Sequence, residues 1–178
     1  MQWTSGLALV FGLGCGSGSS SPPVAEAEPA VQVAPAPAPA PKPTHPADAY
    51  EGLDLSTLTE EESLAKRMEI GEFVYKKGGR KGLACLTCHQ ANGQGLKGAF
   101  PPLVGQEEHM GDCAKHAKTI LDGLQGEMVV DGVTYNGVMV PQRELLTDLE
   151  IASVMTYERL SWGNDFGACL PSDVAALR

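Results

Sequence analysis

The most constraining feature of this chain is the pentapeptide Cys85-Leu86-Thr87-Cys88-His89, whose C-x-x-C-H spacing is typical of covalent haem attachment. Two thiols that add to the two vinyl groups on one edge of a porphyrin must lie a few residues apart on one side of a turn. The next residue is then carried beneath the ring, where an imidazole nitrogen reaches the iron. The sequence therefore predicts one covalently bound haem c on Cys85 and Cys88, with His89 as an axial ligand.

Three other uses of these cysteines compete with haem attachment. A thioredoxin-like redox pair needs a βαβ context, which the hydrophobic pattern lacks. A zinc site would combine Cys85 and Cys88 with Cys113 and His116, whose C-x-x-H spacing supplies a second pair of ligands. A solvent-exposed disulfide between Cys85 and Cys88 is the third alternative.

The N-terminal third of the chain differs in character from the rest. Residues 6–14 form an apolar run too short to span a bilayer, and Cys15 follows it directly. This pattern resembles the signal peptide of a bacterial lipoprotein, in which the cysteine becomes the lipidated first residue. An ordinary cleaved signal with an incidental cysteine is the alternative. We expect residues 1–14 to be a signal peptide and Cys15 to be a lipidation site.

Residues 15–50 are rich in proline, alanine and serine, and they contain the run APAPAPAPKP. This composition favours extended polyproline II and lacks the apolar side chains needed for a core. We therefore assign 15–50 to a lipid-anchored tether and 51–178 to one globular domain. The formal net charge of -9 argues against nucleic-acid binding and favours a partner with a basic docking face.

The globular part reads as mainly helical. Thr59 and Glu62 form a capping box for a helix that ends at Gly78-Gly79, and Thr147 and Glu150 form a second one for the last helix. A middle helix is expected from about residue 112 to 124.

An irregular, glycine-containing segment is expected between the middle and last helices. Val129-Val130 and residues 133–135 could form a small hairpin around Asp131-Gly132. No βαβ alternation appears, so the fold class is all-α.

The haem motif and its surroundings resemble the mono-haem cytochrome c family over most of residues 64–163. Gly71 and Tyr75 match the family's Gly-x-x-x-aromatic pattern in the first helix, and Tyr157 matches its aromatic partner in the last. Phe100-Pro101-Pro102-Leu103-Val104-Gly105 matches the loop that follows the haem motif. The resemblance implies three to four helices around one haem.

Two residues of that loop have roles that the resemblance implies. In the family, the carbonyl of the proline at Pro101 accepts a hydrogen bond from the ligand imidazole. The leucine at Leu103 packs on the ring.

The resemblance also implies a second axial ligand downstream of the motif. The residue types that can supply it are methionine and histidine, and the candidates are Met110, Met128, Met139, Met155, His109 and His116. Met155 falls on the apolar stripe of the last helix and reads as core. Met139 is expected in an extended loop just before that helix, and the family places its ligand methionine in that loop. His89 and Met139 are therefore the predicted iron ligands. Met128 and the two histidines stay open as alternatives.

Two cysteines have no role in the haem site. If Cys15 carries lipid and Cys85 and Cys88 carry haem, then Cys113 and Cys169 remain. In an oxidising compartment they are expected to form a disulfide, and two independent thiols are the alternative.

These features predict a non-enzymatic electron carrier on the periplasmic side of a bacterial membrane. With both axial positions filled, the iron has no room for a substrate, which favours one-electron transfer between redox proteins over catalysis. The stretch from Val133 to Asn164 is also similar to cytochrome domains attached to nitrite reductases and terminal oxidases. A fixed haem subunit of a respiratory complex is therefore the first alternative, and a zinc-binding module is the second.

Overall fold

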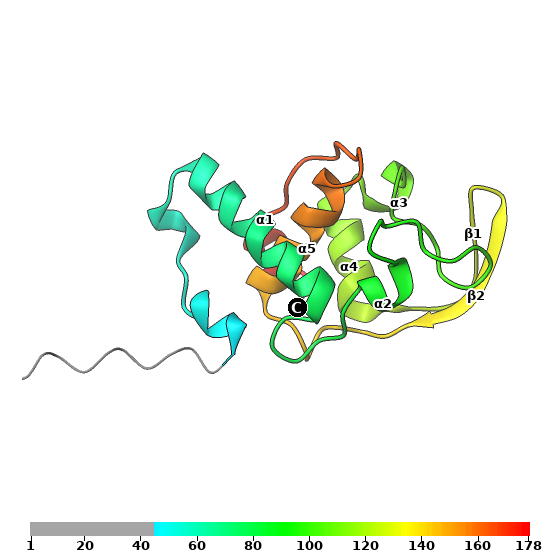
Figure 1. The fold of residues 1–178 in the computed structure, drawn as a ribbon, viewed down its shortest axis with the longest axis horizontal. Helices are drawn as coiled ribbons and strands as arrows, with labels where there is room; N and C mark the ends of the chain where they lie inside the picture. Colours follow the sequence, from blue (N-terminus) through cyan, green and yellow to red (C-terminus); the bar gives the residue numbers. More distant parts are fainter. Residues whose placement is uncertain (1–44) are drawn as a thin grey trace, which may run out of the picture. The chain divides into compact units, whose positions relative to one another are not determined.

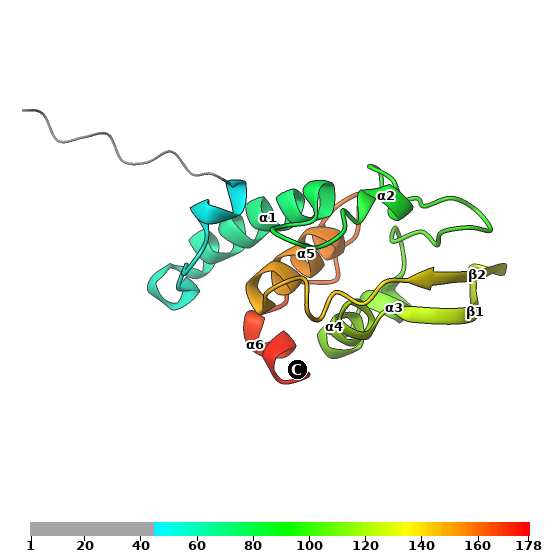
Figure 2. The same ribbon diagram turned by 90° about the horizontal axis from the view of Figure 1, so that it is seen from below.

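The computed structural model describes residues 45–178, and its two longest helices pack against each other. They are α1 (Glu60–Lys77) and α5 (Asp148–Leu160), which lie side by side in both views (Figures 1 and 2). The expected signal peptide, Cys15 and the tether up to residue 44 lie outside the described residues. No helix formed by residues 45–178 has both the length and the apolar character needed to cross a membrane.

Both predicted capping boxes are confirmed. The Thr59 hydroxyl accepts a hydrogen bond from the Glu62 backbone N–H at the start of α1, and the Glu62 carboxylate accepts one from Thr59 N–H. Thr147 and Glu150 make the same reciprocal pair at the start of α5. Each box satisfies two N–H groups that have no partner within the helix, which fixes where the helix begins. Gly78, in the left-handed conformation, ends α1 as expected.

The crossing of α1 and α5 depends on Gly71. A Cβ at this position would lie 2.1 Å from the backbone oxygen of Ser153 on α5, so a larger residue would force the helices apart. The close approach brings the rings of Tyr75 and Tyr157 to a centroid distance of 5.5 Å, and Trp162 packs against both. The predicted contact between the first and last helices is thus confirmed.

The remaining helices are shorter. The expected middle helix is α4 (Cys113–Asp122), capped by the Asp112 side chain. Three others have four or five residues: α2 (Leu86–His89), α3 (Glu107–Met110) and α6 (Pro171–Ala175). The core formed by these helices is continuous and includes Val74, Leu121, Ile151 and Met155.

A two-stranded antiparallel sheet extends the predicted hairpin and corrects the purely helical expectation. Strands β1 (Leu124–Val130) and β2 (Val133–Met139) pair along their whole length around Asp131-Gly132, where both residues have positive φ. The segment expected to be irregular is therefore mostly strand, and Met139 ends β2. Glycine disfavours strands, which explains why the pairing of Gly126 with Gly137 was not anticipated. The domain is mostly helical with one small sheet, which projects beyond the helices (Figure 1).

The residues just before the expected domain boundary also pack on the domain. The short 3-10 helices η1 (Pro46–Ala49) and η2 (Leu55–Thr57) precede α1, and Ala47 is buried. The Tyr50 hydroxyl donates to the Glu150 carboxylate, and Arg80 forms ion pairs with Asp48 and Glu51. Residues 45–50, which we assigned to the tether, therefore contact α5 and the loop after α1.

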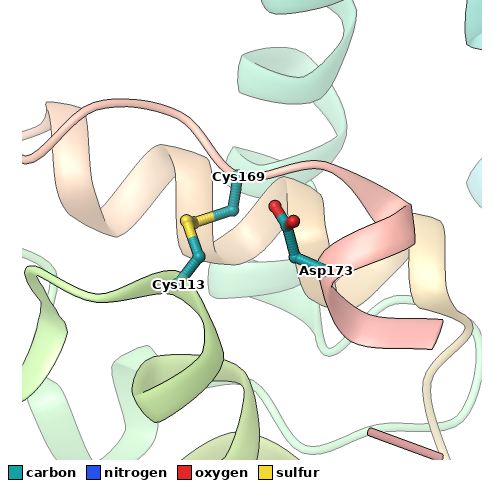
Figure 3. Close-up of side chains that lie close together, drawn as sticks. All are labelled: Cys113, Cys169 and Asp173. Atoms are coloured by element: carbon teal, nitrogen blue, oxygen red, sulfur yellow. A yellow bond between two sulfur atoms is a disulfide. The ribbon is translucent and has the colours of Figure 1, made fainter. Parts of the chain in front are cut away.

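A disulfide joins Cys113, at the start of α4, to Cys169 in the C-terminal segment, with 5.8 Å between their Cα atoms. Figure 3 shows this bond with the Asp173 carboxylate beside it. These three residues do not form a metal site, because both sulfurs are consumed in the disulfide and Asp173 accepts from Leu170 N–H. The bond fixes the last segment of the chain, whose Cys169 and Val174 are fully buried, onto α4 and α5.

The disulfide makes a chemical prediction. Cys113 and Cys169 should resist alkylation in the native protein until a reductant is added, and a non-reducing digest should yield their peptides as one linked species. In the chain-entropy model a bridge across a sequence separation of 56 residues contributes about 4 kcal/mol to the free energy of unfolding. Cys113→Ser should therefore lower the denaturation midpoint, and rapid labelling of both thiols in the unreduced protein would contradict the bond.

Candidate haem site

A cavity of about 210 Å³ lies between the segment around α2, helices α4 and α5, and one face of the hairpin. All six residues predicted to bind a cofactor line it, although they come from distant parts of the chain. They are Cys85, Cys88, His89, Pro101, Leu103 and Met139. The remaining lining is dominated by apolar side chains, as an environment for a porphyrin requires.

The C-x-x-C-H motif adopts a single helical turn. Cys85 precedes α2, and its carbonyl accepts hydrogen bonds from the N–H groups of both Cys88 and His89. This turn places the two cysteines next to the cavity, and both carry free thiols. Two free thiols beside an imidazole on one wall of an apolar cavity are the donor set that covalent haem attachment requires, so the residues present fit the group.

The orientation of His89 is fixed by the loop that follows. Its Nδ1 lies 2.9 Å from the carbonyl oxygen of Pro101, which can only accept a hydrogen bond. Nδ1 therefore carries the proton, and the lone pair of Nε2 is left for a metal. Gly95, with positive φ, makes the turn possible, since a Cβ there would lie 2.3 Å from the Phe100 carbonyl. The expected hydrogen bond from the imidazole to Pro101 is present.

The environment of Cys85 favours the neutral thiol. Burial raises its pKa well above the usual value, and the negative charge of Glu158, to which the thiol is hydrogen-bonded, raises it further. Glu158 is 3% exposed and also lines the cavity. A buried carboxylate thus lies at the wall that carries the thiols of Cys85 and Cys88.

The opposite wall contains the candidates for a second axial ligand. Alternate residues of β1, including Met128, face the cavity, and so does Met139 at the end of β2. His109, Met110 and His116 also line the cavity. Met155, which we interpreted as core, is fully buried in the hydrophobic core.

Met139 is tied to the haem motif by the side chain of Gln142. The Gln142 carboxamide oxygen accepts a hydrogen bond from Leu83 N–H, two residues before Cys85, and its NH₂ group donates to the Val140 carbonyl. The backbone N–H of Gln142 donates to the Ile120 carbonyl near the end of α4. The segment that follows Met139 is therefore anchored on both sides of the cavity.

The zinc alternative is incompatible with these contacts. The Cys113 sulfur is bonded to Cys169, so it cannot bind a metal as a thiolate. The second pair of ligands that a four-coordinate site needs is therefore incomplete.

Sequence reasoning missed three residues that shape the site. Glu158 and Gln142 are polar and would ordinarily be assigned to the surface, yet both are buried. Trp162 follows the last helix and packs against Tyr75, whose hydroxyl donates to the Gln90 carbonyl directly after His89. A tryptophan in a short polar stretch is the one signal that could have indicated packing there.

Comparisons with known proteins agree with this geometry. The family model described as Cytochrome c matches residues 68–159. Two proteins named cytochrome c-552, both from Thermus thermophilus, are 43% identical over 84 residues, which is 45% of this chain and 63% and 56% of theirs. The cytochrome c subunit of a quinone alcohol dehydrogenase from Gluconobacter oxydans is 29% identical over 96 residues, or 53% of this chain and 20% of that protein.

The matched region thus spans less than two thirds of each of these relatives. The family match nevertheless covers more than half of this chain and includes the C-x-x-C-H turn, the Pro101 loop and Met139. Together with the cavity and its donor set, this match shows that the chain belongs to the cytochrome c family, whose members carry covalently attached haem c.

Proposed function

We propose that this protein transfers single electrons through one haem c bound covalently to Cys85 and Cys88, and that it is a carrier and not an enzyme. The proposal is based mainly on one wall of the cavity. Two free thiols lie there next to His89, whose ring is oriented by its hydrogen bond to Pro101. The Thermus cytochromes c-552 support the same assignment.

The haem would supply an iron that alternates between the ferrous and ferric states. The chain's own residues provide the rest of the function. Cys85 and Cys88 would hold the porphyrin on one wall, and the hydrogen bond from His89 Nδ1 to Pro101 leaves the lone pair of Nε2 available to bind the iron. Leu103 and the apolar lining exclude water, so that little reorganisation accompanies the change in charge.

The attachment can be tested on denatured protein. The haem of the wild-type protein should survive acid-acetone extraction and stain on a denaturing gel, because thioether bonds do not dissociate. The double variant Cys85→Ser/Cys88→Ser should release any bound haem, whereas Thr87→Ala, an exposed change between them, should retain it. Freely extractable haem in the wild type would refute the proposal.

We further propose that Met139 is the second iron ligand. Its support is the anchored segment around Gln142, which holds the end of β2 beside α4 and the haem motif. Met128 lies in the middle of β1, where it pairs with Tyr135. A thioether opposite an imidazole stabilises ferrous iron and raises the reduction potential.

The two methionines give a matched comparison. Met139→Ala should abolish the near-infrared sulfur-to-iron absorption band of the ferric protein, lower its reduction potential and open the iron to carbon monoxide. Met128→Ala should leave all three properties as in the wild type, because its side chain is not a ligand. The reverse pattern would assign the ligand to Met128.

The location proposed for the protein is the periplasmic face of a membrane, where Cys15 would carry lipid and residues up to 44 would act as a tether. The support is the apolar run before Cys15 and the proline-rich stretch after it. More than one acyl chain makes anchoring stable. The disulfide is consistent with an oxidising compartment.

The anchor is tested by fractionation. Cys15→Ser should move the haem protein from the membrane fraction to the soluble fraction, and Ser17→Ala should not. Unchanged membrane association of Cys15→Ser would mean that no lipid on Cys15 holds the protein there.

A second candidate function is that of a fixed haem subunit in a respiratory complex. The similarity to the Gluconobacter quinone alcohol dehydrogenase subunit favours it. The chemistry at the haem is the same in both cases. Copurification of the native protein with a multi-subunit oxidoreductase after detergent extraction would select the subunit function, and isolation as a single chain would select the mobile carrier.

A further inference from the structure

Two ionisable side chains are buried together in the haem cavity. His116 on α4 and Glu158 on α5 are 4% and 3% exposed, and His116 Nε2 lies 3.0 Å from a Glu158 carboxylate oxygen. Both residues line the cavity. Val154, one turn before Glu158 on α5, lines it too, so this face of the helix is directed toward the haem site.

The partners of this pair change when haem is attached. Besides His116, the Glu158 carboxylate is hydrogen-bonded to the Cys85 thiol. A thioether has no S–H, so attachment of haem to Cys85 removes that donor. His116 is then the one remaining hydrogen-bond donor to the Glu158 carboxylate that the described residues provide.

The His116–Glu158 pair has two protonation states that differ by one exchangeable proton. With the proton, the histidine and the carboxylate together are neutral overall; without it, they carry one negative charge. Burying a negative charge without a compensating positive charge is unfavourable in free energy. His116 Nδ1 is buried and has no hydrogen-bond partner among residues 45–178, so no other side chain fixes the protonation state of the ring.

Other charged or titratable groups face this region from each neighbouring element. They are Tyr75 on α1, Cys85 and His89 in the haem motif, His109 on α3 and Tyr135 on β2. Arg159 follows Glu158 on α5, and the charges of Asp112 and Asp173 act on Arg159.

Most of these groups are already committed. Burial and the charge of Glu158 raise the pKa of Tyr75, whose hydroxyl donates to a backbone carbonyl. Arg159 donates to backbone carbonyls, including those of Met110 and Gly111, and does not neutralise Glu158. Cys85 as a thioether does not titrate, and His89 is the predicted iron ligand. Of the histidines that line the cavity, His109 is therefore the one to be controlled for.

We propose that His116 and Glu158 form a proton-holding pair that couples electron transfer at the haem to uptake and release of one proton. The proposal rests on the function proposed above. On oxidation, one electron passes from the haem to an acceptor protein and the pair releases one proton to water. On reduction, one electron arrives from a donor protein and the pair takes one proton from water, so charge and protons balance in both directions.

Electrostatics determines the direction of the effect. The ferric haem is one unit more positive than the ferrous haem, and the deprotonated pair is one unit more negative than the protonated pair. A negative charge inside an apolar cavity therefore stabilises the ferric state. The reduction potential should fall as pH rises through the range in which the pair loses its proton.

The test is a spectroelectrochemical titration of the haem-loaded full chain from about pH 5 to about pH 9, the range that brackets histidine titration. The wild-type midpoint potential should decrease with pH. Glu158→Gln keeps the shape of the side chain but removes the charge, and it should raise the potential at high pH and flatten the decrease. His116→Gln should flatten it as well.

Two control variants separate the pair from other sources of pH dependence. Glu127→Gln removes an exposed carboxylate on β1 and should retain the wild-type slope. His109→Gln removes the other cavity histidine that is not the predicted ligand His89, and a slope lost in this variant but kept in His116→Gln would overturn the assignment to the pair. The carboxylates of the haem itself are the same in every variant. Proton release on oxidation, recorded with a pH indicator in weakly buffered solution, should be smaller in Glu158→Gln than in the wild type.

The outcomes distinguish this inference from the proposed function. A wild-type potential that does not change with pH, or a slope in Glu158→Gln equal to that of the wild type, would overturn the coupling while leaving reversible electron transfer intact. If Glu158→Gln fails to fold with haem, the wild-type slope and His116→Gln still decide the matter. Absence of a covalently bound, reversible haem would refute the proposed function itself.

Discussion

The close approach of α1 and α5 at Gly71 is the constraint on which the site depends. It brings the Tyr75 ring into tilted contact with Tyr157 and Trp162, and the Tyr75 hydroxyl donates a hydrogen bond to the Gln90 carbonyl immediately after the haem motif. The same crossing turns the face of α5 that carries Val154 and Glu158 toward the cavity. A side chain at Gly71 would therefore displace both the motif and the wall behind it.

Two buried polar side chains connect this helix pair to the rest of the domain. Gln142 joins the stretch before the motif to the segment after Met139. Glu150 caps α5 and also accepts hydrogen bonds from the Tyr50 hydroxyl and the Arg80 backbone N–H. Burial and the bond to Glu150 raise the pKa of Tyr50, so its hydroxyl stays a donor. The N-terminal segment is thus fixed against the loop that leads to the haem motif.

The parts of the structure that sequence predicted best are those with local causes. Thr59 with Glu62 and Thr147 with Glu150 place helix starts because a capping box involves residues only three apart. The C-x-x-C-H turn is equally local. The long hairpin was underestimated because Gly126 and Gly137 disfavour strands individually, and only their pairing across the sheet stabilises them.

Burial of charge was the least predictable property, since it is decided by residues distant in sequence. Glu158 lies between Tyr157 and Arg159, a context that suggests an exposed turn of helix. Its burial follows from the packing of α4 on α5, which brings His116 from 42 positions away. No local pattern contains that information.

The His116–Glu158 pair is also informative because of what it costs. Replacement of a buried ion pair by apolar residues of similar volume is often neutral or stabilising, so such a pair is weak support for folding. The pair here lies in a cavity that is otherwise suited to an apolar ring, where hydrophobic side chains would pack at least as well. The helix crossing at Gly71, the capped helices and the Cys113–Cys169 disulfide supply stability independently of it. A structure with these other sources of stability tolerates an ionisable pair beside the haem site. At that place the charge of the pair changes the reduction potential, as proton-coupled electron transfer requires.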